Sequence, residues 1–361
     1  MSFLKTFWGL LFRLFPCPTK TGLRRIGSPG PESPVLVTCN FDLTVKRLTK
    51  ILRGLNIWLL VADSKGINVW CAAGGEELNS HSVVSIVKTS EIAAKVNHRT
   101  LILPPLGASG INAADVKSQT GWKIKWGPVR AKDIPRFIED NFKSDVNMKR
   151  VTYDLKERLD TALGSLFPFY LVGGIGFLLF ARHLLMGYLV SGAIAFVVYF
   201  SLCPWIPGKN GFRKAIFLDV ILVGILITTE SFFGREDNVF RVYLIFAMII
   251  IPLYGLELGG MASTMPSDLD PFLARLGIGR IGNVAFAGTI RTELLNGQRE
   301  LSYKRELCKG CKSCAEICPQ GVWNMDDSKR AVLDHREACT ACRACLVQCE
   351  EGAIQAPKVK A

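Results

Sequence analysis

The stretch IWLLVA at residues 57–62 decides how the first part of the chain folds. All six of its residues are apolar, and a run of this length suits a strand that is buried on both faces. We interpret three further runs as buried strands: VLVT (35–38), TLILP (100–104) and KIKWG (123–127). Helical patterns separate these runs, near 43–54, 80–96, 111–119 and 131–141. Alternating strands and helices predict a mainly parallel α/β domain, which we expect to span residues 30–142.

A single thiol lies close to this predicted sheet. Cys71 follows the second strand in the stretch GINVWCAAGGEE (66–77), and parallel sheets bind ligands outside the carboxyl ends of their strands. We expect Cys71 near the N-terminus of a short helix, whose dipole would favour the thiolate. The small residues at 72–75 would let a large flat ligand approach this helix, with Trp70 as a wall. The alternative role for Cys71 is that of a small buried apolar residue.

Charge and hydropathy predict a membrane protein. The net charge is +13, and the basic residues flank apolar runs instead of clustering with aromatic residues, which favours a membrane surface over nucleic acid. Residues 162–260 contain about four apolar stretches of spanning length, near 162–181, 184–206, 214–233 and 239–257. Lys and Arg accumulate on one side of them, which predicts a multi-pass protein of the cell membrane with both termini and both soluble domains cytoplasmic.

Two further segments complete the predicted organisation. Residues 1–18 are apolar with a polar stripe, and we expect an amphipathic helix in the membrane interface, or alternatively a helix docked on protein. Residues 261–300 form a linker to the C-terminal region. The predicted fold is therefore multidomain, with an α/β domain, a four-helix transmembrane domain and a small domain at 301–361.

The strongest chemical signal is a cysteine spacing that occurs twice in residues 301–361. The spacing is C-x2-C-x2-C-x3-C, the run of bacterial two-cluster ferredoxins, in which the fourth cysteine ligates the other cluster. We assign a first cysteine set to one [4Fe–4S] cluster: Cys308, Cys311, Cys314 and Cys349. We assign a second cysteine set to another [4Fe–4S] cluster: Cys318, Cys339, Cys342 and Cys345.

This spacing also predicts the fold and the surroundings of the C-terminal domain. Zinc or disulfides could use the same thiols, but the doubled spacing disfavours both. Cluster ligation needs reduced thiolates, which indicates a cytosolic face and an anaerobic organism. The predicted domain is a small α+β ferredoxin that carries single electrons.

Several stretches resemble a known family. NVWCAAG (68–74) resembles the cap-helix motif of HgcA, the corrinoid protein of mercury methylation, and the related motif of the corrinoid iron–sulfur protein of the acetyl-CoA pathway. SPVLVTCNF (33–41), LILPPLGASG (101–110) and GPVRAKDIPRFI (127–138) are also similar to HgcA. The C-terminal stretches LSYKRELCKGC (301–311) and CPQGV (318–322) resemble its partner ferredoxin, HgcB. The chain thus looks like a fusion of these two proteins.

The resemblance implies a function and a cofactor. Residues 30–142 would be a Rossmann-like corrinoid-binding domain, with Cys71 as the lower axial thiolate ligand of cobalt. The rest of the motif would contact the cobalamin-type corrinoid: Asn68, Val69, Trp70, Ala72, Ala73 and Gly74. The protein would be a membrane-bound methyltransferase that takes methyl from a methylated pterin or its methyltransferase. An electron donor would supply the two clusters, which would reduce the corrinoid, and mercury would accept the methyl group.

Departures from the family pattern keep two alternatives open. Gly75 replaces the lysine of the motif, and the chain ends in APKVKA where HgcB has a cysteine pair. Because Hg(II) prefers thiolates, these differences weaken mercury as the acceptor. One alternative is a corrinoid methyl carrier for a non-mercury acceptor in one-carbon metabolism. The other is a membrane ferredoxin-type electron-transfer protein without corrinoid.

Overall fold

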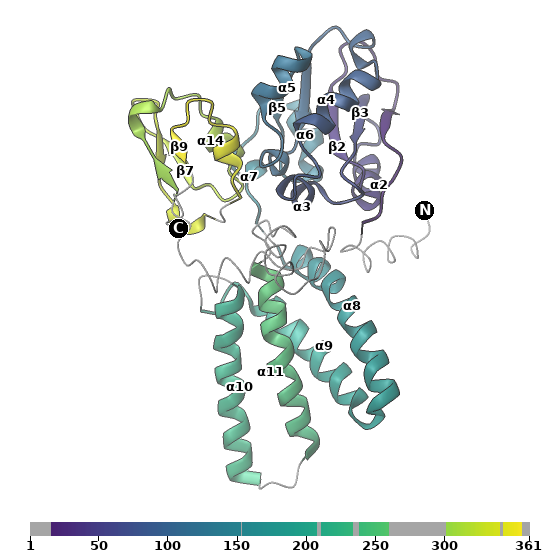
Figure 1. Ribbon diagram of the computed structural model, residues 1–361, viewed down its shortest axis with the longest axis vertical. Helices are drawn as coiled ribbons and strands as arrows, with labels where there is room; N and C mark the ends of the chain where they lie inside the picture. Colours follow the sequence, from purple (N-terminus) through teal and green to yellow (C-terminus); the bar gives the residue numbers. More distant parts are fainter. Residues whose placement is uncertain are drawn as a thin grey trace, which may run out of the picture. The chain divides into compact units, whose positions relative to one another are not determined.

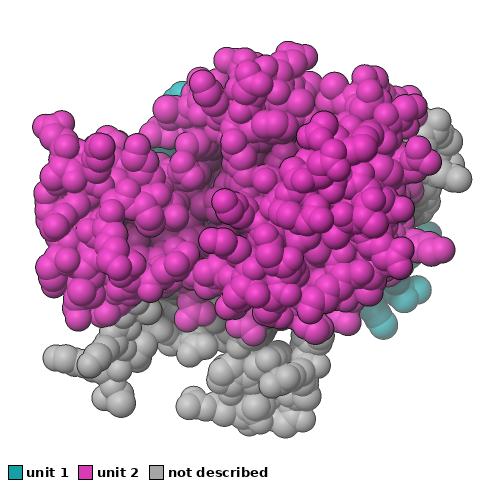
Figure 2. Space-filling model, turned by 90° about the horizontal axis from the view of Figure 1, so that it is seen from above, with its two compact units in different colours: residues 1–14, 152–261 teal, residues 15–151, 262–361 magenta. Residues whose placement is uncertain are grey.

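The computed structural model describes residues 16–152, 154–207, 211–233, 238–259, 301–339 and 342–355. The chain divides into two compact units (Figure 1). Unit 1 consists of residues 1–14 and 152–261, and unit 2 of residues 15–151 and 262–361 (Figure 2). Most of the predicted helix at 1–18 and almost all of the predicted linker at 261–300 lie outside the described residues.

The first part of unit 2 contains a five-stranded sheet in the order β1-β3-β2-β4-β5. Its strands are β1 (Gly22–Ile26), β2 (Val35–Cys39), β3 (Ile57–Ala62), β4 (Thr100–Leu103) and β5 (Lys123–Trp126). Strands β2 to β5 are parallel to their neighbours, which confirms the four predicted strands and the mainly parallel sheet. The prediction that all four are buried is wrong for β5, which lies at a sheet edge with Lys123 and Lys125 exposed. Strand β1 pairs antiparallel with β3 at the sheet edge and was not predicted. Its Arg24 and Arg25 break the apolar pattern, as charged residues often do on edge strands.

Strand residues alternate between two hydrophobic cores, one on each face of the sheet. Val35, Val37 and Leu60 belong to the core beneath α4 (Ser80–Thr89) and α5 (Ala113–Thr120). Leu36, Leu59 and other residues belong to the core beneath α2 (Asp42–Ile51), α6 (Ile134–Glu139) and α7 (Val146–Lys149). Because successive side chains of a strand point to opposite faces, continuous apolar strands require helices on both sides.

The strand order places a topological switch point between β2 and β4. The connection from β2 leads to β3 on one side, whereas β4 and then β5 continue on the other side of β2. The loops that follow β2, β3 and β4 therefore meet at one edge of the sheet, where such folds bind their ligands.

The C-terminal part of unit 2 is a small α+β domain made of two similar halves. Strand β6 (Ser302–Tyr303) pairs with β9 (Ile354–Gln355), and β7 (Trp323–Met325) pairs with β8 (Ala331–Leu333). Short helices α14 (Ser313–Ile317) and α15 (Ala344–Val347) each follow the second cysteine of a run. Lys312 and Arg343, at equivalent positions, both have a φ near +65°. The two cysteine runs thus share one backbone conformation.

The described residues of unit 1 form four long helices, which Figure 1 labels. They are α8 (Leu155–Phe180), α9 (Leu185–Leu202), α10 (Gly211–Phe233) and α11 (Asn238–Gly259). Helix α9 packs against α8 and α11, and α11 packs against α10. The core between them is rich in aromatic residues, with Tyr188, Phe196, Tyr199 and Phe200 buried.

The prediction of a four-helix transmembrane domain is wrong. Within the described part of the chain, one helical segment, Arg182–Leu202, is long and apolar enough to cross a membrane. Tyr170–Phe180 and Arg241–Pro252 are apolar but shorter. Charges near the helix starts shorten the apolar lengths: Lys156, Glu157 and Arg158 in α8, Lys214 and Asp219 in α10. Neither a multi-pass location in the cell membrane nor the orientation derived from it is supported.

Apolar side chains also lie on the outside of unit 1. Val172, Phe180 and Trp205 are 72%, 88% and 74% exposed, and several isoleucines accompany them. Clusters of exposed apolar side chains are typical of surfaces that another molecule covers.

Candidate functional site

Cys71 lies in the first turn of α3 (Val69–Gly74), the short helix that follows β3. Asn68 caps this helix with an extended backbone, and its carbonyl accepts a hydrogen bond from the Ala72 N–H at 2.8 Å. The thiol of Cys71 is exposed. The structure thus confirms that Cys71 is near the N-terminus of a short helix at the carboxyl edge of the sheet.

The other residues of the predicted cofactor motif face different ways. Val69, Ala72, Ala73 and Gly74 are buried, whereas Asn68 and Trp70 are half-buried. The small residues therefore do not open a helix face to a ligand, as we expected. They let the loop after β4 approach α3, because a Cβ on Gly110 would lie 2.6 Å from the carbonyl oxygen of Ala73. Only Cys71, with the half-buried Asn68 and Trp70, is placed to contact a ligand directly.

Asn40 holds the loop that leads into α3, and the sequence analysis missed it. Its Oδ1 accepts hydrogen bonds from the backbone N–H groups of Ser64 at 3.0 Å and Gly66 at 2.9 Å. Its Nδ2 donates to Asp63 at 3.1 Å. Asn40 is buried, and buried amides are normally satisfied in this way. Its position directly after β2, at the switch point, was the available signal.

The N-terminal residues of unit 2 close over the same loop. The backbone N–H of Cys17 donates to the carbonyl of Gly66 at 2.9 Å. Gly66 has a φ of +74°, and a Cβ there would lie 2.4 Å from the nitrogen of Pro18. Only glycine satisfies both conditions, so this contact and the Asn40 bonds together fix the approach to α3.

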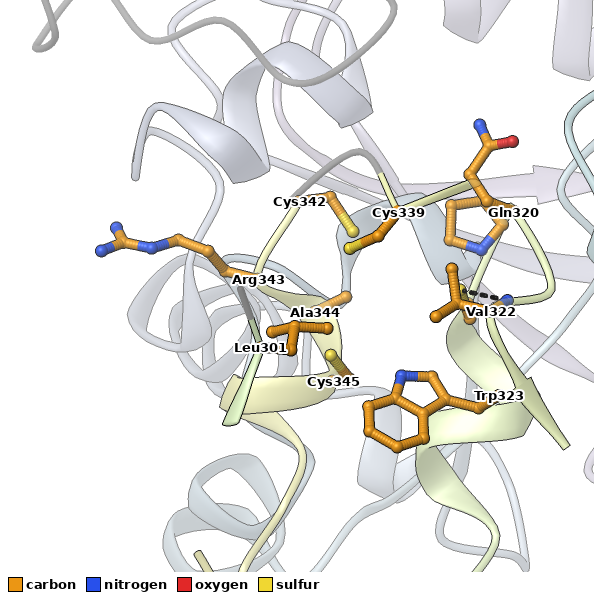
Figure 3. A pocket seen from close by; sticks show the side chains of 11 residues that line it. Leu301, Gln320, Val322, Trp323, Cys339, Cys342, Arg343, Ala344 and Cys345 are labelled. Atoms are coloured by element: carbon orange, nitrogen blue, oxygen red, sulfur yellow. Dashed lines mark hydrogen bonds between the residues drawn. The ribbon is translucent and has the colours of Figure 1, made fainter. Parts of the chain in front are cut away.

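The second cysteine set lines a cavity in the C-terminal domain. Cys318, Cys339, Cys342 and Cys345 contribute to its wall, together with Val322 and Trp323. The sulfur atoms of Cys339, Cys342 and Cys345 point into the same space (Figure 3). The structure therefore brings Cys318, from the first run, to three cysteines of the second run. Their role as cluster ligands stays a prediction.

The first cysteine set is also gathered in one place. The thiols of Cys311, Cys308 and Cys349 are near enough to Cys314 to help burial raise its pKa to about 12. Among the described residues, no three Cys, His, Asp or Glu side chains converge closely enough to hold a single metal ion.

Backbone groups tune the sulfur atoms. The N–H of Val322 donates to Cys318 Sγ at 3.4 Å, and the N–H of Ala331 donates to Cys308 Sγ at 3.5 Å. Burial pushes the pKa of Cys308 upward, but hydrogen bonds to its sulfur, led by that of Ala331, outweigh it and lower the pKa. Burial and the nearby Cys318 raise the pKa of Cys342 to about 11. Bound metal supplies positive charge that deprotonates such thiols outright.

Comparison with known proteins assigns relatives to both parts of unit 2. Residues 14–138 match the family described as CO dehydrogenase/acetyl-CoA synthase delta subunit, and residues 307–354 match the 4Fe-4S dicluster domain. The acetyl-CoA decarbonylase/synthase complex subunit gamma of Archaeoglobus fulgidus is 35% identical over 129 residues, which are 35% of this chain and 27% of the relative. The subunit gamma of Methanopyrus kandleri is 36% identical over 126 residues, which are 34% and 27% of the two chains.

These matches correct the family that the sequence analysis named. They identify relatives in acetyl-CoA decarbonylase/synthase for the N-terminal part, and a fusion of HgcA with HgcB is not shown. Mercury as the methyl acceptor loses its support with that correction. The chain spans less than a third of the length of these curated relatives. What is shown is therefore a similarity of the α/β part to these subunits, followed by a 4Fe-4S domain.

Proposed function

We propose that this protein is a corrinoid-dependent methyl carrier of the kind used in the acetyl-CoA pathway, with an attached ferredoxin domain that reduces its corrinoid. The observation that carries this proposal is the exposed Cys71 thiol at the carboxyl edge of the parallel sheet. The match of residues 14–138 to an acetyl-CoA synthase subunit family supports it, as does the resemblance of residues 68–74 to corrinoid-protein motifs.

The residues around Cys71 fit a large cofactor that brings most of its own ligands. Cys71 offers one thiolate on a helix whose inner face is fixed against the loop after β4. Asn40 and Gly66 hold the preceding loop, so the thiol is positioned before any ligand arrives. A corrinoid would bring most of the ligands of its cobalt and would take one donor from the protein. Cys71 would be that donor.

The proposed roles are divided between the α/β domain and the C-terminal domain. The corrinoid, when bound, would supply a cobalt that carries the methyl group and that can be reduced, one electron at a time, to its reactive low-valent state. Cys71 would bind the cobalt and Trp70 would flank the ring. The two cysteine sets would hold two [4Fe–4S] clusters that deliver those electrons. The methyl donor would be a methylated pterin or its methyltransferase, and the acceptor would belong to one-carbon metabolism.

The relatives also suggest the setting in which the protein works. They are named as subunits of a complex, so we propose that protein partners supply and accept the methyl group. An external one-electron donor would supply the clusters.

The visible spectrum of protein reconstituted with iron, sulfide and cobalamin tests this proposal. We expect stoichiometric cobalamin with a thiolate-to-cobalt absorption that Cys71→Ala abolishes. Cys17→Ala is the matched control, because Cys17 is an exposed thiol of the same unit. Folded protein that is full of iron but binds no cobalamin would reject the proposal in favour of a ferredoxin-type electron-transfer protein.

A further inference from the structure

We propose that Gln348 is a positioning residue that docks the ferredoxin domain on the α/β domain, with the second cysteine set next to the interface. This inference rests on the proposed function for its purpose, which is electron delivery to the corrinoid. Its structural basis is a set of contacts within unit 2.

The carboxamide of Gln348 is satisfied entirely by the α/β domain. Its Nε2 donates to the carbonyl oxygens of Ala108 at 2.9 Å and Ile111 at 2.6 Å. Its Oε1 accepts from the backbone N–H of Ala113 at 3.2 Å. These bonds use both amide hydrogens and the carbonyl oxygen, and the side chain is buried, with 7% exposed. A surface glutamine without a structural role would point to water.

One of the groups that Gln348 binds is at the start of a helix. Ala113 is the first residue of α5, so its N–H has no acceptor within the helix. Asn112 caps α5 through its Oδ1 and uses its Nδ2 to donate to the carbonyl of Val347 at 3.0 Å. The two domains therefore complete each other's hydrogen bonds at this point.

Apolar contacts place the second cysteine set at the same interface. Ala108 of the α/β domain is buried against Ile317 and Ala344, and Cys342 and Cys345 pack against this cluster. Ile317 directly precedes Cys318, and the carbonyl of the following Pro319 accepts a hydrogen bond from the Val151 N–H at 2.9 Å. Cys311 of the first set is instead exposed.

The loop that receives Gln348 is the loop that supports α3. Between Ala108 and Ile111 lies Gly110, the residue on which a Cβ would meet the carbonyl oxygen of Ala73. The neighbouring Gly107 would place a Cβ 3.8 Å from Val69. A continuous series of packed groups thus connects the second cysteine set, the loop at 105–113 and the helix that carries Cys71.

This arrangement defines a direction for electrons. A reduced cluster held by the second set would lose one electron and the cobalt of a bound corrinoid would gain it; the bond between that cobalt and the Cys71 thiolate would break as cobalt(I) forms, with no proton transferred. The first set would then receive the replacement electron from an external one-electron donor. Electron transfer depends on separation, so any loosening of the docked arrangement slows it.

Rapid mixing of the full chain with a chemical reductant tests the inference. The protein is loaded with clusters and cob(II)alamin, and the growth of the cob(I)alamin absorbance is followed. We expect Gln348→Ala to slow this step about tenfold, since it removes the hydrogen bonds to two buried carbonyl groups and to the half-buried N–H of Ala113. Iron content, the electron paramagnetic resonance spectrum of the clusters and cobalamin occupancy should not change. Gln355→Ala is the matched control, because Gln355 is exposed and bonds only within its own domain.

A second variant and a second measurement keep the test independent of cluster assembly. Asn112→Asp keeps the side-chain oxygen that caps the helix, but it replaces the Nδ2 donor to the carbonyl of Val347 with a second acceptor. Asn112 is also remote in sequence from every cysteine. Amide hydrogen exchange at residues 108–113 should rise in both variants. Unchanged exchange and an unchanged rate of cobalt reduction would overturn the inference and leave the proposed function intact. Protein that binds no cobalamin would reject both the proposed function and the electron path. Amide hydrogen exchange at residues 108–113 would then test the docking role of Gln348 by itself.

Discussion

The two sulfur sites of unit 2 differ in how much of a site the chain itself provides. The second cysteine set, drawn from two distant runs, lines a cavity, and the sulfur atoms of Cys339, Cys342 and Cys345 face one space (Figure 3). Cys71 is exposed on a six-residue helix. The proposed cluster site therefore depends on several ligands that converge, whereas the proposed corrinoid site depends on one donor held at the carboxyl edge of the sheet. The two sites should therefore respond differently to substitution.

The largest expected effect is the loss of a ligand from the cavity. We expect Cys345→Ser to remove about half of the iron and to destabilise the C-terminal domain, because small metal domains take much of their folding free energy from ligation. Iron analysis and limited proteolysis would measure this. Cys203→Ser, in unit 1, should keep the full iron content. Full iron in Cys345→Ser would contradict the convergent site.

The second prediction is that a substitution of Cys71 removes a ligand bond without lowering stability. Because its side chain is exposed, Cys71→Ala should change the free energy of unfolding by no more than about 0.5 kcal/mol. The thiolate-to-cobalt absorption should nevertheless disappear. Thermal unfolding and the visible spectrum of the same sample would separate the two effects. A large loss of stability would show that Cys71 is a structural residue.

The third prediction concerns the rigid edge that holds Cys71. A methyl group at Gly110 would lie 2.4 Å from the carbonyl oxygen of Leu78, so Gly110→Ala must displace α3 or its loop. We expect a destabilisation of about 1–3 kcal/mol, measured by denaturant unfolding. Gly30→Ala is the control, since a Cβ there meets nothing within 4 Å. Equal stability of the two variants would mean that α3 is not fixed by this loop.

The smallest effect is a difference in thiol reactivity. Burial raises the pKa of the Cys39 thiol, so little thiolate forms at mildly alkaline pH. We expect iodoacetamide to modify the exposed Cys71 and Cys17 before Cys39, as read by mass spectrometry of the native protein. Denatured protein should lose this order. Early modification of Cys39 in folded protein would contradict its burial beneath the sheet.

The sequence predicted the parts that depend on local pattern. The four apolar runs became β2 to β5, and the doubled cysteine spacing led to two gathered thiol sets. Strand β1 was missed because pairing on one side tolerates arginines. The prediction of four membrane spans was wrong because charges near the helix starts, such as Lys214 and Asp219 in α10, shorten the apolar lengths, and one helical segment of the described chain meets the requirement.

The sequence alone determined which residues could act as ligands, because ligand type and short-range spacing are local properties of a chain. It did not determine which side chains face inward. The alanines after Cys71 proved to be packing residues, since Gly110, far along the chain, lies against them. Nor did any pattern single out Asn40 or Gln348, whose partners are 23 or more residues away. Only the tertiary structure decided these contacts, because hydrogen bonds and packing join groups by distance in space.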